Sequence, residues 1–125
     1  MTPRTADILA GNARVIAGLA ESAEGPEFAG AKLGVVAMLS VLAAQEAETG
    51  VAVRVAENRA IRAALGEAGE DAELTMAALD AANAALRRRL IAAHAAAAPG
   101  SAEDRAFVRL YGRMAAARML VLPPM

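Results

Sequence analysis

Three asparagines are the side chains of this sequence whose type and spacing best suit a polar site. Each stands in a stretch of the form A-x-N-x-x-[VIL]-x-x-x-L, namely AGNARVIAGL, AENRAIRAAL and AANAALRRRL. Together the stretches contain every asparagine of the chain, which are Asn12, Asn58 and Asn83. A buried amide is costly unless it is hydrogen-bonded, so we expect these side chains to have polar partners.

Two functions fit the three amides. In the first they bond to one another or to backbone and fix the register of the helices, as a core asparagine does in a coiled coil. In the second they line a polar cavity together with arginines. Arg54, Asn58 and Arg62 are one helical turn apart, and with Asn83 and Arg87 they would bind an anion such as a carboxylate or phosphate. We favour the register function and interpret the arginines as a solvated face or ordinary salt bridges.

Other chemical groups are sparse. His94 is the single histidine, and we interpret it as a boundary residue at the end of its helix rather than a catalytic base. The residue three positions before it is Ile91, so the Glu-x-x-His pair of di-iron bundles is missing. The chain has no cysteine, which excludes disulfides, thiol nucleophiles and zinc–thiolate sites. We therefore predict no catalytic residues, no metal and no cofactor.

The composition indicates a helical protein that is short of bulky core residues. Hydrophobic residues make up 57% of the 125 residues, but most of these are alanine, with two Phe and one Tyr. Alanine favours helix and buries little area, so the helices must pack closely or share apolar surface with a second copy. Thirteen basic and fourteen acidic residues leave a net charge of −1, which does not favour nucleic-acid or anionic-membrane binding.

The sequence predicts a cytoplasmic protein. Its first residues lack the basic and apolar regions of a signal peptide. The most apolar run, LGVVAMLSVLAA at 33–44, would span about 18 Å as a helix, short of the ~20 residues that a bilayer requires. We expect this run to be the deeply buried centre of the core. One lysine beside twelve arginines, with abundant alanine and glycine, suggests a GC-rich bacterial source.

Breaks at Gly25-Pro26, GEAGED and APGS divide the chain, and a capping box begins at Ser101. The apolar seams have helical spacing and include Leu79, Leu86 and Leu90, then Phe107, Leu110 and Met114. The predicted helices are 5–23, 26–65, 71–97 and 102–120, in a single domain over 1–125. We predict an all-α antiparallel four-helix bundle, or five helices if Gly50 breaks the second. A continuous second helix would be about 60 Å long, more than its neighbours can cover, which favours a homodimer.

The stretch AALDAANAALRRRLIAA is similar to the first helix of the all-helical chorismate mutases, which supplies an arginine to the substrate. Those enzymes also need further arginines, a lysine, and a Gln or Glu around a dicarboxylate. Lys32, the only lysine, precedes the hydrophobic run and does not match this pattern. The resemblance implies a small-molecule enzyme as the alternative function.

Four segments, in order, resemble small helical proteins encoded in bacterial operons beside phosphotransferase-like kinases and acyl-CoA dehydrogenases. They are AKLGVVAMLSVLAAQEAE, AENRAIRAALGE, ELTMAALDAANAALRRRL and DRAFVRLYGRMAAARML. This resemblance implies an accessory or partner-binding role. We therefore expect a non-enzymatic, homodimeric interaction module. An adaptor would instead expose an apolar patch around Val121, Leu122 and Met125.

Overall fold

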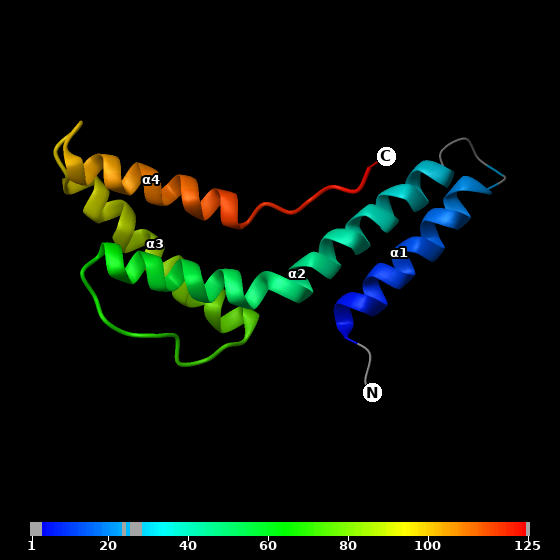
Figure 1. Ribbon diagram of the computed structural model, residues 1–125, viewed down its shortest axis with the longest axis horizontal. Coiled ribbons are helices and arrows are strands. Elements are labelled where there is room, and N and C mark those ends of the chain that lie inside the picture. Colours follow the sequence, from blue (N-terminus) through cyan, green and yellow to red (C-terminus); the bar gives the residue numbers. More distant parts are fainter. Residues whose placement is uncertain (1–3, 24, 26–28, 125) are drawn as a thin grey trace. The chain divides into compact units, whose positions relative to one another are not determined.

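The computed structural model describes residues 4–23, 25 and 29–124, and over these residues it contains four α-helices and no strand (Figure 1). The helices are α1 (Thr5–Glu21), α2 (Ala29–Ala64), α3 (Met76–Ala96) and α4 (Ala102–Ala117). The predicted all-α class is confirmed. Pro26, with which the second helix is expected to begin, lies outside the described residues.

Side-chain caps fix the starts of the last two helices. The hydroxyl of Ser101 accepts a hydrogen bond from the amide of Asp104 at 3.1 Å, as the capping box predicts, although the Asp104 carboxylate accepts from the amide of Gly100. The prediction that α3 begins at 71 is wrong, because Thr75 is its cap and accepts from the amide of Ala78. Asp71 instead lies before the helix, where it is free to contact α2.

Gly50 does not break α2, so the five-helix alternative is wrong. The glycine is buried within the helix, and its carbonyl accepts a hydrogen bond from Nη1 of Arg54, one turn later. The helix ends at Ala64, and two residues later the chain turns at Gly66, whose positive φ of 71° is a conformation that glycine adopts without strain.

The chain divides into two compact units, and the boundary within α2 falls at Gly50. The first unit comprises Met1–Thr49 and Leu120–Met125, and the second comprises Gly50–Met119. One bundle over 1–125 is expected from the sequence, whereas the structure divides into two units. The reason is that α1 and the tail associate with the first part of α2, and α3 and α4 share a core with the second part.

The second unit has the hydrophobic core of the protein. Residues from three helices meet in it: Ile61 of α2, Leu86 and Leu90 of α3, and Phe107, Leu110 and Met114 of α4. The seams that the sequence predicts for α3 and α4 are therefore confirmed as buried faces. These faces hold three helices in register around the polar contacts described below.

The first unit is a pair of helices with a small interface. In Figure 1, α1 lies beside the first part of α2, and Nη1 of Arg4 bonds to Glu48 at 2.8 Å. The buried residues between these helices are small, Ala13 of α1 with Ala37 and Ala44 of α2. The expectation that 33–44 is deeply buried is wrong: of the described residues, only those of α1 and the tail pack on it, and Val36 and Leu39 are about half exposed.

Of the described residues, α2 alone is long and apolar enough to cross a membrane, judged by length and composition. Only 17% of its most apolar 18-residue stretch is buried inside the protein. The prediction that no segment is long enough considers only the twelve-residue run at 33–44. The helix that contains this run, α2, is much longer.

Candidate functional site

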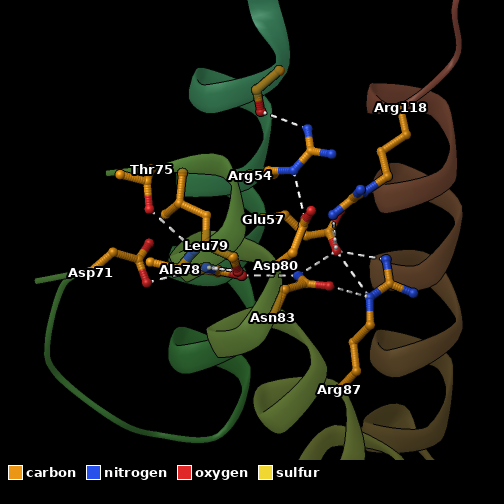
Figure 2. A network of polar contacts seen from close by, with 12 residues as sticks. Arg54, Glu57, Asp71, Thr75, Ala78, Leu79, Asp80, Asn83, Arg87 and Arg118 are labelled. Atoms are coloured by element: carbon orange, nitrogen blue, oxygen red, sulfur yellow. Dashed lines mark hydrogen bonds and ion pairs between the residues drawn. The ribbon is translucent and has the colours of Figure 1, made fainter. Parts of the chain in front are cut away.

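The polar centre of the second unit is the carboxylate of Glu57, which is 4% exposed. Figure 2 shows it between Arg87 of α3 and Arg118, the residue that caps the C-terminus of α4. Nη2 of Arg87 donates to Oε1 of Glu57 at 2.6 Å, and Nε of Arg118 donates to Oε2 at 2.7 Å. One carboxylate of α2 thus binds both other helices of the unit.

Asn58 and Asn83 lie beside this carboxylate and bond to each other. Nδ2 of Asn83 donates to Oδ1 of Asn58 at 2.9 Å and to Oε1 of Glu57 at 2.7 Å, while its carbonyl accepts from Nε of Arg87. Nδ2 of Asn58, which is fully buried, donates to Asp71 and to the carbonyl oxygen of Leu79. Both amides therefore use all their donors and their acceptor within the chain.

Arg62 and Arg54 extend the network along α2. Arg62 Nη2 bonds to Oδ1 of Asp71 at 2.8 Å, and Arg54 Nε bonds to Oδ1 of Asp80 at 2.6 Å. Within the part of the chain that the structure describes, Nη1 of Arg62 and Oδ2 of Asp71 are buried and make no hydrogen bond. This end of the network therefore keeps unused hydrogen-bonding capacity.

The five residues predicted to bind a ligand, Arg54, Asn58, Arg62, Asn83 and Arg87, all belong to this network of the second unit. Asn12 does not share their environment. It is exposed on α1, so its predicted burial is wrong: the face of α1 that meets α2 carries Ala13, and Asn12 lies about 100° away around the helix.

His94 lies half-buried near the end of α3, as expected for a boundary residue. Its Nε2 is 2.7 Å from Oδ1 of Asp104, and its Nδ1 is 3.2 Å from the hydroxyl of Tyr111. The ring is also 5.2 Å from that of Phe107. The histidine thus links α3 to the first three turns of α4. The hydrogen bond from the Gly100 amide, followed by that from His94, lowers the pKa of Asp104.

Sequence reasoning did not select Glu57, Asp71 or Arg118 as site residues. The available signal for Glu57 is its place one turn before the buried Ile61, which puts a carboxylate on the core seam. Arg118 similarly follows the buried Met114 by one turn. Asp71 has no periodic signal, since it lies in the segment between α2 and α3.

The charge of Glu57 couples the stability of the second unit to pH. Burial opposes ionisation, but hydrogen bonds from Arg118, Arg87 and Asn83 outweigh it, so the pKa of Glu57 lies below its ordinary 4.5. A group with a lower pKa in the folded state stabilises fully above its unfolded pKa, and this stabilisation is lost as the pH falls through the folded pKa. When the pH is lowered below about 4.5, we expect the midpoint temperature of thermal unfolding, measured by circular dichroism, to decrease. This decrease with pH should be less steep for Glu57→Gln than for the wild type. Equal slopes for the two proteins would contradict this coupling.

The geometry defines an all-helical protein whose second unit is held by an internal network of one buried carboxylate, two amides and several arginines. No protein-family model, curated protein or solved structure matches the chain.

Proposed function

We propose that the protein is a non-enzymatic interaction module of the bacterial cytoplasm that acts as a homodimer. In this proposal the first units of two copies associate, and their helices together form an antiparallel bundle. The observation that carries it is the exposed apolar surface of the first unit, which a lone pair of helices leaves uncovered.

Apolar side chains are exposed on both helices of the first unit, on sides other than the ones that meet at Ala13, Ala37 and Ala44. Ile8, Val15 and Leu19 share one face of α1, and Val15 is 65% exposed. Val36 and Leu39 share a face of α2. Large apolar side chains that remain exposed along two adjacent helices support association with another apolar surface.

A second copy fits this surface better than a lipid bilayer does. A membrane-spanning stretch of 18 residues that begins anywhere from Ala29 to Gln45 would include Glu46. Glu48, two residues later, forms an ion pair with Arg4. Placing such groups in hydrocarbon costs a few kcal/mol each. Gln45 also bonds to the backbone of Val121 through both ends of its amide, a contact that a spanning helix would carry into the membrane.

The internal bonding of the second unit supports a structural rather than an enzymatic function. A ligand at Asn58 or Asn83 would have to displace hydrogen bonds that already use every polar atom of both amides. Anion binding by the arginines, with a small-molecule or chorismate-mutase-like activity, stays a prediction. The buried Nη1 of Arg62, which makes no hydrogen bond within the described residues, favours it, whereas the carboxylate of Asp71 beside it would repel an anion.

Sedimentation equilibrium tests the proposal. We expect a mass near twice the 12.7 kDa of one chain at micromolar concentration, and a monomer for Leu39→Glu with unchanged helix content. A wild-type monomer at high micromolar concentration would overturn the proposal. So would a monomer that co-sediments with phosphatidylcholine vesicles, since a lipid surface would then be what covers α2.

A further inference from the structure

One face of α2 in the first unit has a regular pattern. Its residues follow steps of four and three: Lys32, Val36, Leu39, Ala43 and Glu46. This is the heptad spacing that keeps side chains on one side of a helix for contact with a second helix. Lys32, Val36, Leu39 and Ala43 are exposed, and Glu46 is half-buried.

The contacts within the first unit lie on other sides of α2. Ala37 and Ala44, which are buried, are on the side opposite Leu39. Next to this contact, Pro123 and Pro124 of the tail line a cavity of about 700 Å³ with residues of α1 and α2 that include Ala37. Neither Val36 nor Leu39 lines that cavity. Among the described residues of this unit, neither the buried contact with α1 nor the cavity beside the tail therefore involves Val36 or Leu39.

The charges at the two ends of this face are opposite, and both are seven residues from Leu39. If two copies of the helix pair antiparallel about a two-fold axis at Leu39, Lys32 of each copy lies opposite Glu46 of the other. A parallel pairing would instead place like charges together at both ends, which is unfavourable. The pattern is thus complementary to itself in one orientation and one register.

Resting on the proposed homodimer, we propose that its interface is an antiparallel contact between two copies of α2, centred on Leu39 and bounded by two Lys32–Glu46 ion pairs. Leu39 of one copy packs against Leu39 of the other, and Val36 packs against Leu42 and Ala43. The small side chain of Ala43 lets the two helices approach closely. The two ion pairs set the orientation and the register.

Charge reversal tests the pairing. In Lys32→Glu and in Glu46→Lys, like charges face each other twice in the dimer, and we expect the dissociation constant to rise roughly tenfold for each variant. The double variant restores the opposite pairs, so its dissociation constant returns to within about threefold of wild type. Arg88→Glu makes the same change of charge as Lys32→Glu at an exposed residue of α3, so it is the matched control for that variant and leaves the constant unchanged.

Cross-linking tests the position of the axis, because the wild-type chain has no cysteine. Leu39→Cys places two thiols opposite each other at the axis, within the Cα separation of about 4.4–6.8 Å that a disulfide requires. We expect it to form a disulfide-linked dimer under mild oxidation. Val108→Cys is a matched control in α4, since Val108 is 57% exposed and Leu39 is 55% exposed. It should cross-link much more slowly.

The outcomes distinguish a failure of the α2 interface from a failure of the proposed homodimer. A wild-type monomer removes the homodimer itself. If the wild type is a dimer but the double charge variant is no tighter than the single ones, or if Leu39→Cys cross-links no faster than Val108→Cys, the α2 interface is wrong and the dimer forms elsewhere. Rescue by the double variant together with selective cross-linking at Leu39 supports the interface.

Discussion

Replacing Glu57 with alanine is expected to lower the free energy of unfolding by about 3 kcal/mol, because it removes the buried acceptor that binds three side chains. Asn83, Arg87 and Arg118 all donate to this carboxylate. Without it the amide of Asn83 loses a partner in the interior, and two arginines lose their counter-charge. The arginines are partly exposed and regain water, so the loss stays at the lower end of the range for buried pairs.

Urea unfolding followed by circular dichroism measures this loss. Glu70→Ala is the matched control, because Glu70 is also a glutamate bonded to an arginine but both members of its pair are exposed. It should change the free energy of unfolding by less than about 0.5 kcal/mol. Similar losses for the two variants would show that the Glu57 network adds no more than a surface ion pair.

The sequence predicts the helices of this protein well because their signals are local. The capping hydroxyl of Ser101, the apolar seam of α3 and the glycine-rich breaks each act over a few residues. The start of α3 is predicted wrongly because Asp71 and Thr75 both suit the N-cap position by residue type. The carboxylate of Asp71 bonds to Arg62 of α2 instead, and Thr75 caps the helix. Local propensity cannot weigh such a contact.

Burial was harder to predict than helix formation. The run at 33–44 has the composition of a core helix, yet Val36 and Leu39 are exposed because one neighbouring helix covers only one side of α2. Composition cannot distinguish a helix buried within its own chain from one that needs a second chain. The site shows the same limit, since Asn58 and Asn83 were expected to pair but the central Glu57 was not selected.

Replacing asparagine with alanine is expected to change the free energy of unfolding by different amounts in the similar A-x-N stretches of α1 and α2. Asn58→Ala removes a fully buried amide that bonds to Asp71, Asn83 and the carbonyl oxygen of Leu79. The groups left without partners and the cavity should lower the free energy of unfolding by about 2–4 kcal/mol. Asn12→Ala changes an exposed side chain of α1 and should have an effect within about 0.5 kcal/mol.

Urea unfolding of both variants, with Asn83→Ala and the Asn58/Asn83 double variant, completes the measurement. Because the two buried amides bond to each other, the double variant should lose clearly less than the sum of the single losses. Additive losses would show that each amide acts through its other partners. A large loss for Asn12→Ala would mean that the first stretch is buried in the assembled protein, and the shared A-x-N pattern would then mark three interior positions. A small loss limits that interior role to α2 and α3, where the chain supplies the polar partners itself.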